Sequence, residues 1–326
     1  MFQSGSRSLI FLLGLLTSSL GAQADLAKAQ VLFEGKRYPE AQSLADQVVK
    51  ADPRDAEAWY LLARIQRVNG TMKQAVAYAE KAIQLDPGQA RYHLLRGRAL
   101  GNIAQNANMF KAMTMAGDVR GSFEKAVQLE PSNRDAFLSL FDYYLNVPSI
   151  AGGGLDKAQA LAERTLPLDA SRGHYMKGVV LQRQKNPGAA QAEYRQSLAA
   201  DPTFSVVYNL LGYVELEMNQ VDLALEHFQK QVALDPTNPN SYDSLGDGLM
   251  AKGRTDDAIM SYRKALSVDP DFYASMRSLG KALEKAGKRD EAIQHYQRCA
   301  ELGRQKGIPQ MVKEAHARLK ALGVQD

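Results

Sequence analysis

Apolar and polar positions in the segment 240–270 follow the period of two successive amphipathic helices. In the first helix, Tyr242, Leu245 and Gly246 stand at i, i+3 and i+4 and therefore share one face. A second stripe follows the turn residue Gly253 and consists of Ala258, Tyr262 and Ala265. The segment predicts a helix–turn–helix unit in which the small residues mark a close crossing of the two helices.

An acidic residue followed by proline closes this segment, and the same pair recurs along the chain. Proline cannot continue a helix, so each pair predicts where a second helix ends. The prolines are Pro53, Pro87, Pro131, Pro202, Pro236 and Pro270. Of the five spacings between them, three are 34 residues, whereas the other two, 44 and 71 residues, contain additions. A unit ending near Asp169–Ala170, where alanine replaces the proline, divides the longest spacing, so about eight units cover residues 25–304.

Other units carry the same residue types at the same positions. These are Tyr208, Leu211, Gly212, Ala224, Phe228 and Pro236 before the segment, Leu279, Gly280, Gly287, Ala292 and Tyr296 after it, and Trp59, Leu62, Ala63, Gly70, Ala75, Ala82 and Pro87 nearer the N-terminus. In this pattern the chain resembles the tetratricopeptide repeat (TPR) family. The resemblance implies an all-α fold, a right-handed α-solenoid of about eight helix–turn–helix TPR units. Residues 305–326, with a helix beginning at Pro309, are expected to form a C-terminal capping helix.

Two units depart from the pattern at the aromatic position. His93 stands there in one unit and His174 in the unit that lacks the closing proline. We expect both histidines to pack as structural residues.

Two insertions interrupt the period, and both are predicted to lie between the two helices of a unit. The first falls within 102–118 and the second covers 146–154, where Pro148 and three glycines predict a loop. The first insertion carries the apolar residues Met109, Phe110, Met113 and Met115. These side chains either form an adaptable contact surface for a partner, since methionine is flexible and polarizable, or extend the local core.

The first 24 residues have the features of a secretory signal peptide. Arg7 precedes an apolar run over 9–16, and Ala22-Gln23-Ala24 provides the small residues that a signal peptidase requires. The run is shorter than the roughly 20 residues that span a bilayer, although an uncleaved anchor is the alternative. Together with the two insertions, this segment gives the chain the aspect of TPR proteins exported in Gram-negative bacteria. We expect cleavage before Asp25, a periplasmic protein and no stable membrane insertion after cleavage.

Composition excludes several classes of protein. A formal charge of +4 over 326 residues is too small to indicate nucleic-acid binding. The single cysteine, Cys299, excludes an intramolecular disulfide framework and a cysteine-rich metal site. No HExxH, GxSxG or GxxxxGK[ST] motif occurs in the sequence. The sequence therefore predicts no enzyme, no cofactor and no metal site.

Candidate partner-binding residues lie one position away from the packing stripe of each first helix, where TPR units form their concave surface. They are Tyr60, Arg64, Arg67, Arg91, Arg98, Tyr175, Tyr213, Asp243, Asp247, Arg277 and Lys281. Arginine and aromatic residues are favoured at the centres of interfaces, although a merely solvated face is the alternative. Arg64, Arg67, Arg91 and Arg98 are expected to converge and to accept an acidic or C-terminal carboxylate-bearing segment.

The sequence as a whole predicts a non-catalytic periplasmic scaffold that binds a protein or peptide segment in the concave TPR groove. The alternative function is a structural subunit of an envelope assembly for secretion, pilus formation or polysaccharide export. The partner and the oligomeric state are not encoded in any motif of the sequence.

Overall fold

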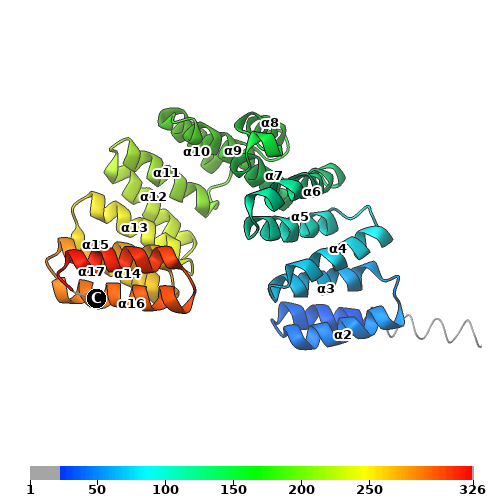
Figure 1. Cartoon of the computed structure of the whole chain (residues 1–326). Coiled ribbons are helices and arrows are strands. Elements are labelled where there is room, and N and C mark those ends of the chain that lie inside the picture. The colour runs from blue at the N-terminus through cyan, green and yellow to red at the C-terminus, as the bar shows by residue number, and fades with distance from the viewer. Residues whose placement is uncertain (1–22, 325–326) are drawn as a thin grey trace, which may run out of the picture. The chain divides into compact units, whose positions relative to one another are not determined.

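The computed structural model describes residues 23–324, and every regular element in that range is a helix (Figure 1). The all-α prediction is therefore confirmed. The chain divides into two compact units, and the boundary falls between Leu161 and Ala162. The predicted signal peptide lies almost entirely outside the described residues, and no helix within them is long and apolar enough to span a bilayer.

Helices of ten or more residues make up both units. The first unit contains a helix at 23–34, α2 (Tyr38–Ala51), α3 (Ala56–Val68), α4 (Met72–Leu85), α5 (Ala90–Gln105), α6 (Met109–Leu129), α7 (Arg134–Asn146), the short 3₁₀ helix η1 (Ser149–Ala151) and the start of α8 (Leu155–Thr165). The second unit contains α9 (Ala170–Arg183), α10 (Pro187–Ala200), α11 (Ser205–Glu217), α12 (Val221–Leu234), α13 (Pro239–Ala251), α14 (Thr255–Val268), α15 (Tyr273–Lys285), α16 (Arg289–Gln305) and α17 (Pro309–Ala321).

Successive helices pack in pairs, and the first helices of neighbouring pairs also contact one another. The pairs α3–α4 and α5–α6 in the first unit, and α11–α12 and α13–α14 in the second, have extensive contacts. The first helices α3, α5 and α7 contact one another in order, as do α11, α13 and α15. These three first helices in each unit therefore form one continuous face.

A glycine on the first helix lets an aromatic ring of the second helix approach closely in five pairs. The glycine–aromatic partners are Gly97 with Phe123, Gly178 with Tyr194, Gly212 with Phe228, Gly246 with Tyr262, and Gly280 with Tyr296. A Cβ atom added to Gly212 would lie 2.5 Å from the ring of Phe228. All five rings are buried, so they fill the crossing of the two helices as the sequence predicts.

The turns between paired helices use the left-handed backbone conformation. Gly253 has a φ of 81°, which glycine adopts without steric cost. At the equivalent turn of two other pairs, Lys185 and Asn219 adopt a φ of 59°. The repeat geometry therefore imposes this conformation even where the residue is not glycine.

The aromatic position of the first helix anchors the preceding proline turn through a hydrogen bond. The Nε1 of Trp59 donates to the carbonyl oxygen of Pro53 at 3.0 Å, and the hydroxyl of Tyr208 donates to that of Pro202 at 3.2 Å. His93 makes the equivalent contact, with Nε2 lying 3.0 Å from the oxygen of Pro87. His93 therefore performs the structural role that its position predicts.

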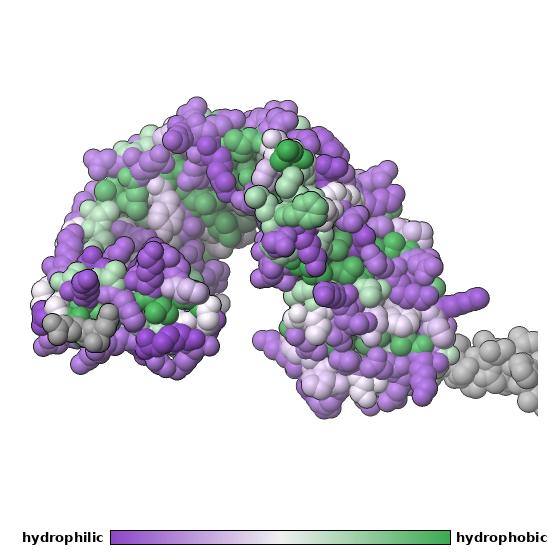
Figure 2. All heavy atoms as spheres, viewed as in Figure 1, coloured by the Kyte–Doolittle hydropathy of each residue, from purple (hydrophilic) through white to green (hydrophobic). Residues whose placement is uncertain are grey.

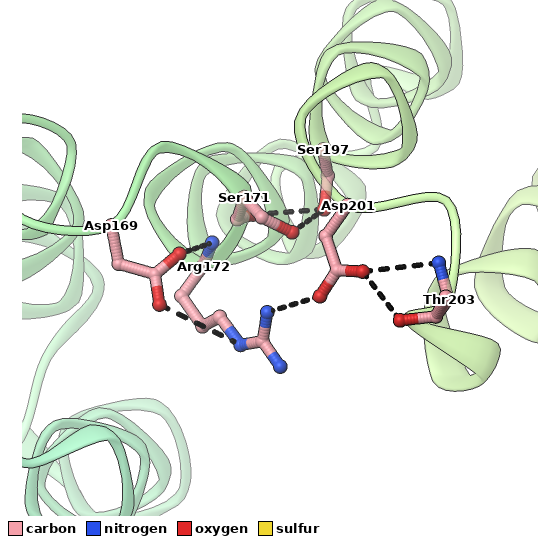
Figure 3. A network of polar contacts seen from close by, with 6 residues as sticks. All are labelled: Asp169, Ser171, Arg172, Ser197, Asp201 and Thr203. Atoms are coloured by element: carbon pink, nitrogen blue, oxygen red, sulfur yellow. Dashed lines mark hydrogen bonds and ion pairs between the residues drawn. The ribbon is translucent and has the colours of Figure 1, made fainter.

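Polar contacts hold the junction where the closing proline is missing (Figure 3). Asp169 caps α9 by accepting the backbone N–H of Arg172 at 3.1 Å. The guanidinium of Arg172 donates to Asp201 at 2.7 Å and lies over the ring of Phe204 at 4.1 Å. Hydrogen bonds from the hydroxyl of Thr203 and, as the next largest cause, from Arg172 lower the pKa of the Asp201 carboxyl to about 2. Arg172 thus links the start of one repeat to the start of the next.

The first insertion mainly lengthens helices. It extends α5 to Gln105 and lets α6 run over 21 residues from Met109. The second insertion, predicted at 146–154, is a loop with the single turn η1, except that Asn146 is the last residue of α7. At the other end of the chain, α17 packs on α16 and buries Met311, Ala315 and Leu319.

Candidate partner-binding surfaces

Two of the predicted arginines flank the ring of Tyr60 on α3. The guanidinium of Arg64 lies 5.9 Å from the centre of this ring, and that of Arg91 lies 5.3 Å from it. Each guanidinium already has a carboxylate partner from the preceding helix pair. Arg64 donates to Glu34 at 2.8 Å, and Arg91 pairs with Glu57. An incoming carboxylate would have to displace these partners.

The expected convergence of four arginines requires a correction. Arg98 turns toward α7, where it donates to Asp135 at 3.1 Å and to the hydroxyl of Ser139 at 3.2 Å. Arg67 is exposed near the end of α3. Arg64 and Arg91 are therefore the two whose guanidiniums contact the ring of Tyr60, whereas Arg98 is bonded to two residues of α7.

The predicted acidic end of the concave surface also requires a correction. Asp243 is 5% exposed and accepts a hydrogen bond from the hydroxyl of Ser275 at 2.6 Å. Burial raises the pKa of this carboxyl to about 6, against the opposing effect of Ser275. Asp247 accepts hydrogen bonds from Tyr213 and Tyr262, each at 2.8 Å. Asp243 is thus an interior residue, and Asp247 and Tyr213 are engaged in a contact between helix pairs.

The remaining predicted residues of the second unit lie in two places. The ring of Tyr175 packs against that of Phe204, 5.2 Å away. Arg277 and Lys281 stand at the edge of a cavity of about 340 Å³ between α15, α16 and α17. The floor of this cavity includes Cys299, and burial raises the pKa of that thiol to about 11. This thiol is accordingly a poor nucleophile at neutral pH.

The two insertions, which are separate in the sequence, come together on the first unit. They line a cavity of about 690 Å³, which we call the insertion groove. Its walls come from the end of α5, the first half of α6, α7 and the loop 147–151. Met109 and Met113 line it from α6, and Ile150 lines it from the loop. Figure 2 shows hydrophobic atoms at the surface where Figure 1 labels α6 and α7.

The solvent exposure of its side chains shows whether the first insertion forms a contact surface or extends the core. Met109 is 76% exposed, Phe110 is 79% exposed and Met113 is 44% exposed. These three side chains therefore do not extend the core, whereas Met115 is half-buried. Phe110 is not among the residues that line the insertion groove.

Tyr143 on α7 fixes the geometry of the insertion groove. Its hydroxyl lies 2.9 Å from the carbonyl oxygen of Ala116 on α6 and 2.7 Å from that of Ala151 in the loop. One buried hydroxyl thereby joins three segments of the wall. Gly153 packs directly on the carbonyl of Val147, where a side chain would not fit. The loop is therefore held against α6.

Sequence reasoning missed the groove itself and the contribution of Ile150, which is 82% exposed. A signal was present, because a large apolar residue between Pro148 and Gly152 lies in a loop that has no core to bury it. The polar residues of the groove include Arg98 and Asp142. Among residues 23–324, no group of three or more His, Cys, Asp or Glu side chains could hold a metal ion.

The stacked helix pairs define an α-helical repeat protein with an extended surface. A Tetratricopeptide repeat family model matches residues 26–90, 175–239 and 244–306. These segments make up more than half of the chain, and the chain belongs to the tetratricopeptide repeat family. Proteins of this family generally mediate protein–protein interactions, and their fold is typically a non-catalytic scaffold.

Comparisons with individual proteins agree with this assignment. The chain is 25% identical over 156 residues to a DnaJ homolog subfamily C member 7 homolog of Schizosaccharomyces pombe. That match covers 47% of this chain and 32% of the relative, so the chain spans about a third of the relative's length.

Two solved structures share the fold. A tetratricopeptide repeat protein of Parabacteroides merdae has a TM-score of 0.61 at 12% identity, over 80% of this chain and 98% of that one. The human IFIT1 dimer with PPP-AAAA has a TM-score of 0.57 at 18% identity, over 93% and 73% of the two chains. At these identities the likeness concerns the fold alone.

Proposed function

We propose that this protein is a non-catalytic periplasmic scaffold that binds a protein partner through the insertion groove. The observation that carries the proposal is the grouping of Met109, Met113 and Ile150, all exposed, in the lining of one cavity. Contiguous apolar patches are rare on the surface of soluble proteins unless they mark an interaction site. Two insertions that break the repeat period supply these residues, whereas the repeat positions supply the core.

The insertion groove is better suited to a partner than the predicted arginines. Arg64 and Arg91 are held by Glu34 and Glu57, so an acidic segment would exchange one ion pair for another. Exposed ion pairs contribute only about 0–1 kcal/mol, so little is gained by the exchange. Covering apolar surface yields about 25 cal/mol for each Å² removed from water. The groove offers that gain without breaking an existing contact.

The triple variant Met109→Gln, Met113→Gln, Ile150→Thr is expected to lose capture of the native partner from periplasmic extract, by about tenfold or more. Its melting temperature should stay close to that of the parent, because the three side chains are exposed. Met260→Gln is the matched control, since Met260 is 61% exposed on α14 of the second unit. The measurement is quantitative mass spectrometry of the captured proteins, together with calorimetry of each variant.

Unchanged capture by the folded triple variant would contradict this use of the groove. It would favour the alternative function, a structural subunit of an envelope assembly that contacts its neighbours through other surfaces. A large fall in melting temperature would show that the three residues belong to the core.

The periplasmic location rests on the N-terminal segment and on where the core begins. Residues 23–25 are exposed, and Leu26 is the first buried residue among those described. Cleavage after Ala24 would therefore remove no described core residue. Sequencing of the protein from the periplasmic fraction is expected to begin at Asp25. A chain that retains Met1 in the membrane fraction would contradict both the cleavage and the location.

A further inference from the structure

The insertion groove presents side chains to a partner rather than backbone hydrogen-bonding groups. Three of its walls are helices, and several backbone groups at the helix ends near the groove have partners outside the regular helix pattern: the N–H of Lys111 donates to the side chain of Asn108, and the carbonyl oxygens of Asn102 and Ala104 accept from the N–H groups of Asn106 and Ala107. Much of the loop backbone is paired as well, since the N–H of Val147 donates to Tyr143, that of Ala151 to Pro148, and that of Gly152 to Ser149. An extended segment entering the groove would place its unpaired backbone against apolar side chains, which is costly. A helix satisfies its backbone internally and avoids this cost.

The shape of the groove also suits a helix. Met109, Met113 and Ala116 line it from α6 at spacings of three and four residues, which form a ridge along one helix face. Such ridges pack into the grooves between the side chains of a second helix.

One carboxylate gives the groove a charge preference. Asp142 on α7 lines the groove, and Arg98 is the cation that acts on its carboxyl. Arg98 is already bonded to Asp135 and Ser139. Asp142 is exposed, yet the surrounding helices remove part of its water, and this desolvation raises the pKa of its carboxyl. A cation brought by a partner would restore a favourable environment for the charge.

We propose, on the basis of the function given above, that the partner segment is an amphipathic helix of another protein. Its apolar ridge lies between Met113 and Ile150, and a lysine or arginine on the flank of the ridge pairs with Asp142. Apolar burial supplies the affinity, and the ion pair selects basic over acidic helices. The positive net charge of the chain disfavours the binding of basic peptides in general. A preference for a basic helix would therefore indicate binding next to Asp142.

The test uses three synthetic peptides of about 15 residues, the length at which a helix becomes marginally stable in water. One has leucines at i, i+3, i+4 and i+7 with flanking lysines, one replaces lysine with glutamate, and one scrambles the leucine–lysine order. Fluorescence anisotropy measures binding to the mature protein, and circular dichroism measures the helicity of the peptide. The leucine–lysine helix is expected to bind most tightly and to gain helicity on binding.

Asp142→Asn is expected to weaken binding of the leucine–lysine helix by about tenfold, an amount typical of one desolvated charge contact. Asp118→Asn is the matched control, because Asp118 is an exposed acid on α6 outside the groove. Equal binding by Asp142→Asn and the parent, or equal binding of the scrambled peptide, would overturn the proposal. A dimer that forms through the groove and excludes the peptides, seen by sedimentation, would also overturn it.

The two proposals fail in different ways. If the triple variant at Met109, Met113 and Ile150 loses the native partner while Asp142→Asn retains it, the groove is the partner site and the basic helix is wrong. If the triple variant retains the native partner, the proposed function fails first.

Discussion

Gly212→Ala is expected to destabilise the second unit by about 2–3 kcal/mol, since overpacking of a filled core typically costs 1–3 kcal/mol. The added Cβ would lie 2.5 Å from one ring atom of Phe228 and 2.8 Å from another. Phe228 is fully buried and contacts Gly248 on its other side, so the ring has no free space to enter. The usual gain of about 1 kcal/mol from replacing a helical glycine is therefore outweighed. Urea denaturation followed by circular dichroism measures the change.

Two variants serve as controls for this steric explanation. Gly121→Ala lies inside α6 with no atom within 4 Å of the new Cβ, so it is expected to stabilise the protein by about 0.5–1 kcal/mol. Phe228→Leu removes the ring, and the double variant with Gly212→Ala should be more stable than the two single effects would give by addition. Additive effects would show that contact with the ring is not the cause.

Asp243→Asn is expected to become progressively more stable than the parent as the pH rises from about 4 to 6, by about 3 kcal/mol in total. Burial raises the pKa of Asp243 from 3.8 to about 6, so between these values the folded state binds more protons than the unfolded state. The parent therefore loses stability as the pH rises through this window, and the loss is complete above pH 6. Asparagine can still accept the hydrogen bond from Ser275 and carries no charge at any pH.

The measurement is the free energy of unfolding of the two proteins at matched pH values between 3.5 and 8. Ser275→Ala removes the hydrogen bond that lowers the pKa of Asp243, so it should move the transition to higher pH. Parallel pH profiles of Asp243→Asn and the parent would refute the assignment.

The sequence predicted the helix pairs because the same residue types recur at the same positions in successive repeats. Gly212 and Phe228, or Gly246 and Tyr262, stand sixteen residues apart, and four of the five glycine–aromatic pairs share this spacing, so the close crossing can be identified without any structure. The candidate site was less predictable. Arg64, Arg91 and Arg98 were visible as cations, but Glu34, Glu57 and Asp135, which hold them, come from neighbouring helix pairs. The sequence could not show that Asp243 is buried, because neighbouring positions on a helix can belong to its packed face or to its exposed face.

The insertion groove separates what the sequence determines from what the tertiary structure determines. The sequence by itself determined the repeat, the helix ends at the prolines, the turns and the positions of the two insertions, because all of these follow from spacing over a few tens of residues. Only the tertiary structure decided that Met113 and Ile150 line one cavity and that Asp142 stands beside them. Thirty-seven residues separate Met113 from Ile150, and their proximity depends on the lengthened α6, on the turn at 147–154 and on the hydroxyl of Tyr143 that joins both to α7. No periodic signal encodes such a contact, because it arises from packing between segments that the repeat pattern does not include.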